Sequence, residues 1–148
     1  MEKTSEFLIY LMACSLQGTK PEEALLANID MEALLRLAKA HSVSAMVCMA
    51  LEQTDAFQHA AETTRLKWLN AKNKAVRKNM LLDAERHQLE KEFAEHGIWY
   101  MPLKGSILKD WYPKFGMREM ADNDILFDAS KPVSYTHLRA HETRRHLV

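Results

Sequence analysis

The chain has 148 residues, of which 47% are hydrophobic and 27% are charged, which is enough apolar material for one domain with a real core. The formal net charge is zero, which excludes a whole-protein electrostatic attraction to nucleic acid, membranes or acidic substrates. The apolar run at residues 7–16 is too short for a membrane span and lacks a small-residue cleavage site, so we expect a cytoplasmic protein with no membrane partner.

The first half of the chain has the periodicity of amphipathic helices. Thr4 or Ser5 stands where the cap of a first helix is expected, and Pro21 with the acids after it predicts the start of a second. Asp30 is the expected cap of a third helix. The break at residues 41–44 then predicts a short fourth helix after it.

Residues 56–95 contain neither proline nor glycine, so we expect one long helix, or two with a kink, ending at Gly97. The first part of this stretch, residues 65–78, carries cations and no acid. The cations are Arg65, Lys67, Lys72, Lys74, Arg77 and Lys78. Charge runs on long helices are usually solvated, so binding of RNA or another polyanion at 65–78 is the weaker interpretation.

The pattern changes after Gly97. Residues 98–101 and 124–127 are short, apolar and β-prone, and residues 106–111 between them have helical character. The predicted class is therefore α+β, with a mostly helical N-terminal region followed by the first strand, helix and strand of a catalytic domain. The predicted boundaries place the helical region at 1–96, the catalytic part at 97–133 and a tail at 134–148.

Two carboxylates stand two positions apart, at Asp122 and Asp124. On a strand, alternate residues share a face, so both would point the same way and Asn123 would point to the other side. Two carboxylates that close repel each other unless a cation lies between them, and Mg²⁺ prefers such oxygen ligands together with substrate phosphates. The same residues are also good turn formers, so solvated turn residues are the alternative.

Gly105 and Ser106 lie between the expected strand and the expected helix. A glycine there lets the backbone approach a ligand, and amides that open a helix favour an anion such as a phosphate. A phosphate-binding turn beside a carboxylate pair is what metal-assisted phosphoryl chemistry needs. The simpler alternative is that Gly105 only ends a strand and that Lys104 is a surface charge.

Together these residues resemble the polymerase-beta nucleotidyltransferase superfamily, and most closely its uncharacterised bacterial branch, over residues 98–128. The shared pattern stands here as Leu103-Lys104-Gly105, Tyr112-Pro113, Gly116-Met117-Arg118 and Asp122-Asn123-Asp124. One position departs from that pattern, because Asn123 occupies a place that is most often aliphatic. A buried amide there needs hydrogen-bond partners.

The resemblance implies a role for each matched residue. The NTP-binding set would be Lys104, Gly105, Ser106 and Arg118, and the catalytic, metal-binding set would be Asp122 and Asp124, which would hold two Mg²⁺ ions. For Arg118, an ion pair with Glu119 or another acid is the alternative. A third carboxylate on a later strand usually completes such sites. The chain offers no clear candidate for it, since Asp128 follows too soon.

The implied reaction is Mg²⁺-dependent transfer of a nucleoside monophosphate from an NTP to an acceptor hydroxyl, with pyrophosphate leaving. The acceptor would be a protein, a small molecule or RNA, and the fold does not choose between them. Without a third carboxylate we expect this chain to be inactive by itself. The alternative function is a non-catalytic helical interaction module with a degenerate nucleotide site.

The tail at 134–148 shares no pattern with what precedes it and resembles translated adapter sequence at the ends of some metagenomic gene models. We therefore expect a chain truncated near Val133, and we assign no role to Glu142 or to the histidines of the tail. Five residues elsewhere are expected to serve as packing residues: Cys14, Cys48, Trp68, Trp99 and Trp111.

Overall fold

The computed structural model describes residues 2–26 and 28–128 of the chain. It is 66% helical with a small two-stranded antiparallel sheet, which confirms the predicted α+β class. The segment at 134–148 that resembles adapter sequence lies outside the described residues, and so does Glu142. No helix in the described part of the chain combines the length and the apolar character that crossing a membrane requires.

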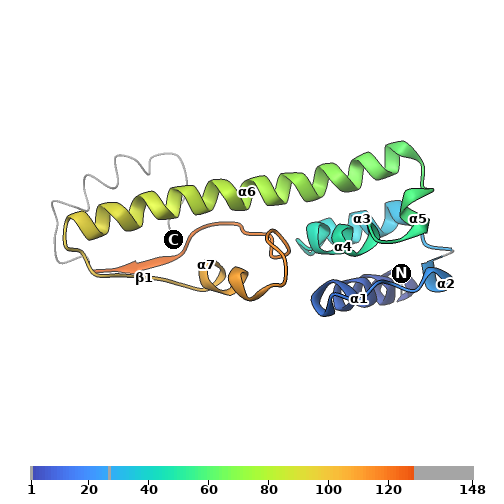
Figure 1. Cartoon of the computed structure of the whole chain (residues 1–148), viewed down its shortest axis with the longest axis horizontal. Helices are drawn as coiled ribbons and strands as arrows, with labels where there is room; N and C mark the ends of the chain where they lie inside the picture. The colour runs from blue at the N-terminus through green and yellow to red at the C-terminus, as the bar shows by residue number, and fades with distance from the viewer. Residues whose placement is uncertain (1, 27, 129–148) are drawn as a thin grey trace.

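Five short helices form a compact group at one end of the molecule (Figure 1). They are α1 (Glu2–Gln17), α2 (Glu23–Leu26), α3 (Met31–Ala40), α4 (Ser44–Leu51) and α5 (Asp55–Gln58). Their core is aliphatic and includes the fully buried Leu11, Leu34 and Val47. The cap predicted at Asp30 is confirmed, because its carboxylate accepts hydrogen bonds from the Glu32 and Ala33 amides at 3.0 and 2.9 Å.

The cap predicted for the first helix is wrong. Helix α1 already begins at Glu2, so Thr4 and Ser5 lie inside its first turns. Glu2 and Lys3 are good helix formers, and nothing in the sequence stops the helix from extending over them. The helix after Pro21 begins at Glu23, as its acidic start predicted.

One helix runs along the whole molecule. Helix α6 (Glu62–Glu95) has 34 residues, which at 1.5 Å per residue gives it a length of about 51 Å. The long helical stretch predicted in this part of the chain is thus two helices, because residues 59–61 separate α5 from α6. The predicted end is confirmed, since α6 stops before Gly97. Its first half packs on α3 and α4, and its second half lies over the remaining elements (Figure 1).

A small sheet packs on the second half of α6. Strand β1 (Tyr100–Pro102) pairs antiparallel with β2 (Ile125–Phe127). Phe127 on one face of this sheet stacks on Phe93 of α6, with ring centroids 5.3 Å apart. The chain between the strands forms α7 (Gly105–Leu108) and a 3-10 turn, η1 (Lys109–Trp111), which together agree with the single helix predicted there to within one residue.

The predicted packing residues divide into two groups. Trp68, Cys14 and Cys48 are buried, as predicted, and burial raises the pKa of the Cys48 thiol to about 12. Trp99 and Trp111 are not packing residues, because 59% and 79% of their surface is exposed. The prediction was wrong for these two because the sheet is only two strands wide in the described residues, and α7 with η1 is short.

Trp68 is the largest fully buried side chain, and its indole N–H donates to the Met31 carbonyl at 3.2 Å, which fixes α6 against α3. We expect Trp68→Ala to lower the free energy of unfolding by about 3–5 kcal/mol, the range typical of large aromatic truncations in cores. Urea denaturation followed by circular dichroism measures it. Leu66→Ala, on the exposed side of the same helix, is the control and should change stability by less than about 0.5 kcal/mol.

Candidate functional site

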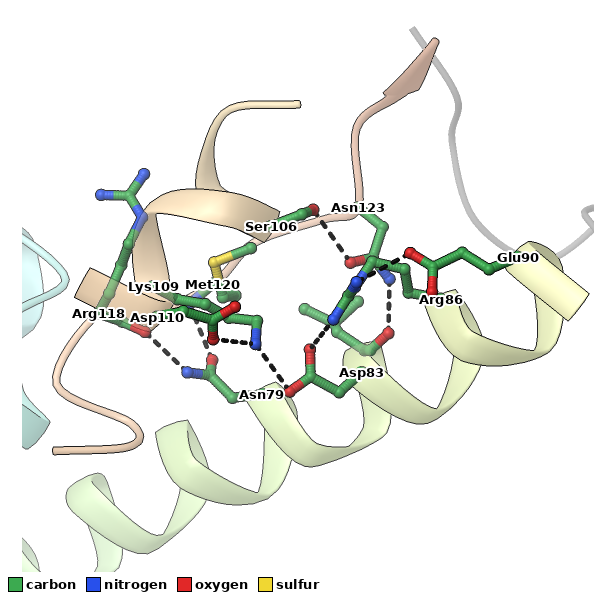
Figure 2. A network of polar contacts seen from close by, with 11 residues as sticks. Asn79, Asp83, Arg86, Glu90, Ser106, Lys109, Asp110, Arg118, Met120 and Asn123 are labelled. Atoms are coloured by element: carbon green, nitrogen blue, oxygen red, sulfur yellow. Dashed lines mark hydrogen bonds and ion pairs between the residues drawn. The ribbon is translucent and has the colours of Figure 1, made fainter. Parts of the chain in front are cut away.

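The segment at 103–124 contains the residues singled out from the sequence, and most of it has no regular secondary structure. Its backbone groups therefore need partners outside a helix or sheet. Asn79 of α6, which is 1% exposed, supplies two of them. Its side-chain amide donates to the Arg118 carbonyl at 2.8 Å and accepts from the Met120 N–H at 3.0 Å (Figure 2). One side chain thus holds the backbone on both sides of Glu119.

A charged cluster on the same face of α6 holds the 3-10 turn. The Lys109 ammonium lies 3.1 Å from the Asp83 carboxylate and 2.9 Å from that of Asp110. Arg86 pairs with Asp83 and with Glu90, one turn further along the helix (Figure 2). Burial lowers the pKa of Lys109, but its hydrogen bonds to Asp110 and Asp83 raise it by more. The pKa of Lys109 is therefore raised, and its charge is kept in a nearly buried position.

Glu119 ties the segment to the helical group. Its carboxylate accepts from the Ser44 hydroxyl at 2.6 Å and from the Ala45 amide at 2.9 Å. The cap position of α4 is Val43, which has no side chain able to do this, so Glu119 caps α4 from 75 residues away in sequence. Among the described residues Glu119 forms no ion pair with Arg118, and its Oε1 accepts both of these hydrogen bonds instead.

Gly105 packs tightly against the segment that carries Arg118. A Cβ atom at Gly105 would lie 2.9 Å from Met120 Cε and 3.4 Å from Arg118 Nε, so only glycine fits without moving these side chains. The Arg118 Nε is itself buried and has no hydrogen-bond partner among the described residues. In Figure 2 the Arg118 side chain extends away from α6, on the side opposite the hydrogen bond of its carbonyl.

At Gly116, in the same motif as Arg118, a similar steric conflict requires glycine. Its φ is +86°, and a Cβ atom there would lie 2.6 Å from Val76 Cγ2 of α6. Glycine is thus needed both for the backbone conformation and for the close approach of the loop to the helix. Two of the four motif elements are in this way explained by packing against neighbouring side chains.

Lys104 joins the two halves of the motif. Its ammonium lies 3.0 Å from a carboxylate oxygen of Asp124, twenty residues later, although 74% of the Lys104 side chain is exposed. The backbone of Lys104 has φ 48° and ψ −118°, a conformation that a residue other than glycine rarely adopts. Such backbone strain is found most often at ligand-binding and catalytic sites.

The acidic pair does not lie on the strand, which corrects the prediction. β2 begins at Ile125, so Asp122 and Asp124 both precede it. The pairing stops there because the chain turns into α7 at Lys104, which leaves Leu103 N–H to donate to the Asp124 carbonyl as the last bond of the ladder, at 2.8 Å. Asp124 is half-buried, and Asp122 is exposed.

Asn123, between the two carboxylates, points to α6. Its amide donates to the Leu82 carbonyl at 2.7 Å, and its oxygen lies 3.5 Å from the Ser106 hydroxyl, which donates to it (Figure 2). The departure from the aliphatic pattern is thus accommodated, since this amide has both partners that it needs. Ser106 itself is buried, and its amide donates to the Leu103 carbonyl at 3.2 Å.

Comparison with known protein families assigns this chain to one of them. A family described as uncharacterised nucleotidyltransferase matches residues 27–135, which includes α3 to α6 as well as the motif segment. The chain belongs to this nucleotidyltransferase family. No curated protein and no solved structure matches the chain significantly.

Within this nucleotidyltransferase, the structure brings some of the predicted residues together and leaves others apart. Lys104 contacts Asp124, and Arg118 lies beside Gly105. Asp122 makes no ion pair or side-chain hydrogen bond with another described residue, and the described residues contain no cluster of three or more potential metal ligands. Sequence reasoning missed the roles of three residues that hold the site in place, and no local pattern marks them, because other polar residues stand close to each: Asn79, Lys109 and Glu119.

Loss of the Lys109 ion pairs tests the charged cluster. We expect Lys109→Met to lower the free energy of unfolding by about 2–3 kcal/mol, because the partly buried Asp83 then keeps only its 3.4 Å contact with Arg86. Chemical denaturation at neutral pH measures this loss. Lys114→Met removes an exposed lysine from the same loop and should leave stability within about 0.5 kcal/mol of wild type; an equal loss in the two variants would contradict the account.

The raised pKa of Lys109 also predicts a pH dependence. A group whose pKa is higher in the folded state contributes its full stability below its ordinary value, here 10.5, and loses it as pH rises through the folded value. The stability difference between wild type and Lys109→Met should therefore be constant from neutral pH to about pH 10 and should shrink above it. Denaturation curves of both proteins between pH 7 and pH 11 would show it. A difference that grows at high pH contradicts it.

Proposed function

We propose that this chain binds an NTP with Mg²⁺ as the nucleotide-binding half of a nucleotidyltransferase. In this proposal Asp122 and Asp124 are the metal ligands, and the triphosphate lies along Lys104, Gly105, Ser106 and Arg118. The observation that carries it is the 3.0 Å contact between Lys104 and Asp124, which links the Leu-Lys-Gly turn to the acidic pair. The ammonium neutralises a half-buried carboxylate, and a divalent cation beside the same oxygen would do the same.

The residues present fit a magnesium ion in part. Two carboxylates provide hard oxygen donors, and Mg²⁺ is commonly held by one or two carboxylates with phosphate oxygens and water as its other ligands. Asn123 between them donates its amide to α6, whereas the carboxylate of Asp124 faces Lys104, so Asp124 is the better supported of the two ligands. When bound, Mg²⁺ would neutralise negative charge on the triphosphate. In this proposal the complete site holds two Mg²⁺ ions.

The two cations have distinct tasks. Arg118 would donate from a planar, permanently charged group, and its buried Nε, which lacks a partner among the described residues, lies beside Gly105. Lys104 would leave Asp124 when the metal arrives and turn to a phosphate, because its long exposed side chain is free to move. The release of Lys104 makes metal and nucleotide binding favour each other.

The backbone contributes less than the sequence predicted. The amides of Ser106, Ile107 and Leu108 all donate to the Leu103 and Lys104 carbonyls. The expected cradle of helix-opening amides is therefore largely occupied within the turn itself. We accordingly place most of the phosphate affinity on side chains and assign Gly105 the role of allowing a close approach, with the hydroxyl of Ser106 directed to Asn123.

The reaction that completes this function is transfer of a nucleoside monophosphate to an acceptor hydroxyl, by in-line attack with pyrophosphate leaving. The described residues supply the binding and orientation of the donor nucleotide, and no third carboxylate stands with the acidic pair among them. The acceptor, whether a protein, a small molecule or RNA, would be selected outside the motif segment. The direct test for this chain is therefore nucleotide binding, not turnover.

Titration of a fluorescent NTP analogue with and without Mg²⁺ tests the proposal. Wild type should bind more tightly with Mg²⁺, and EDTA should reverse the gain. Asp124→Asn should lose roughly ten- to a hundredfold of the Mg²⁺-dependent affinity, as for loss of a metal-site residue, while its metal-free binding should not fall, because Lys104 is already released. Glu95→Gln, which removes an exposed acid at the far end of α6, is the matched control and should bind as wild type.

Two results would contradict the proposal. If the NTP affinity of wild type is the same with and without Mg²⁺, the acidic pair is not part of the binding site. No binding of any NTP would favour the other function considered for this chain, a non-catalytic helical interaction module with a degenerate nucleotide site. The buried hydroxyl of Ser106 and the amides around it, which already donate within the turn, would then explain why no nucleotide binds.

A further inference from the structure

We infer that Asn79 of α6 is a positioning residue of the nucleotide site, through which the helix sets the place of Arg118 beside Gly105. This inference rests on the proposed function. Asn79 lies 39 residues before Arg118, outside every motif element, and it would not touch the nucleotide. Its effect on binding would be transmitted through the backbone that it holds.

The contact is specific to an amide side chain. Asn79 donates to the Arg118 carbonyl at 2.8 Å and accepts from the Met120 N–H at 3.0 Å, so it uses a donor and an acceptor at once (Figure 2). A carboxylate has no proton to donate, and a hydroxyl of serine is too short to span both backbone groups from the same Cβ. Because Asn79 is almost fully buried, water cannot replace either bond at low cost.

The backbone held in this way determines where two side chains leave the loop. Met120 is buried, and its Sδ and Cε fill the space beside Gly105 that a Cβ atom would need, at 3.0 and 2.9 Å. Arg118 leaves the chain two residues earlier, and its Nε lies 3.4 Å from the same Cβ position. Met120 thus packs against the Gly105 turn. Arg118 lies beside the same turn, and its buried Nε–H has no partner in the described residues.

The remaining anchors of the loop do not perform this task. Glu119 joins the segment to α4, on the side of the helical group, and Asn123 joins its other end to the Leu82 carbonyl. Neither bonds the backbone of Arg118 itself. If Asn79 is removed, these anchors keep the loop on the protein while the peptide groups of residues 118 and 120 are free to shift, and with them the guanidinium of Arg118.

A double-mutant cycle tests the inference on the whole chain, with affinity for a fluorescent NTP analogue and Mg²⁺ as the readout. Asn79→Ala alone should weaken binding roughly tenfold, the lower end of what loss of a supporting residue costs at such sites. In the Arg118→Ala background the same change should weaken binding by less than about threefold, because the side chain that Asn79 positions is already gone. A structural role alone would produce equal factors in both backgrounds.

Two further variants separate positioning from loss of fold. Phe57→Leu, in the core at the distant end of the helical group, should lower the melting temperature but leave NTP affinity as in wild type. Asn79→Ser places no charge in this buried position, cannot make both bonds, and should weaken binding in the same background-dependent way if Asn79→Ala is too unstable for the assay. The inference is overturned by equal factors in the two backgrounds, or by wild-type affinity in both Asn79 variants. Absence of Mg²⁺-dependent binding in wild type would instead overturn the proposed function.

Discussion

The arrangement of this molecule depends on how one irregular segment satisfies its backbone and polar groups. Residues 112–124 have no helix or strand of their own, and a buried peptide group without a partner is costly. The partners in the middle of the segment come from one face of α6, where the Asn79 side chain and the Leu82 carbonyl are spaced along less than one turn. A single rigid helix thus fixes the path of a loop that could not hold its own shape.

The same helix carries the charges that the loop requires. Asp83 is one turn beyond Asn79 and receives Lys109, while Arg86 bridges Asp83 and Glu90 on the helix itself. Because these charges are nearly buried, the cluster adds little net stability. Its main contribution is specificity, since only one arrangement of the loop on α6 pairs all of its charges. Glu119 extends the network to the N-terminus of α4, which makes the position of the loop depend on the helical group as well. The family match, which begins in that group, spans the same elements.

Much of this structure could be predicted from local sequence patterns. Asp30 caps its helix, α6 stops just before Gly97, and the order of helices, strand, helix and strand is as expected, because each depends on residues close in sequence. The family followed from four short motifs spread over 103–124. The roles assigned to the individual motif residues stay predictions, because only a binding measurement tests them.

What could not be predicted depends on contacts between distant residues. Asn79 reads as one more polar residue on a charged helix, and its task is visible only once the loop of Arg118 lies against it. Glu119 likewise reads as a neighbour for Arg118, yet its partners are 74 and 75 residues away. The exposed Trp99 and Trp111 were misjudged for the same reason, because an apolar side chain is buried only where another element covers it.

The central claim is that α6 holds the Lys104–Gly105 turn, Arg118 and the acidic pair on one side of the molecule as a single metal–nucleotide site. Paramagnetic broadening by Mn²⁺, recorded on backbone amides with an NTP present, tests it most directly. The account predicts that the amides of Gly105, Asp122 and Asp124 broaden first and together, while those of α1 keep their intensity. Broadening centred elsewhere, or broadening of the acidic residues without the turn, would contradict it.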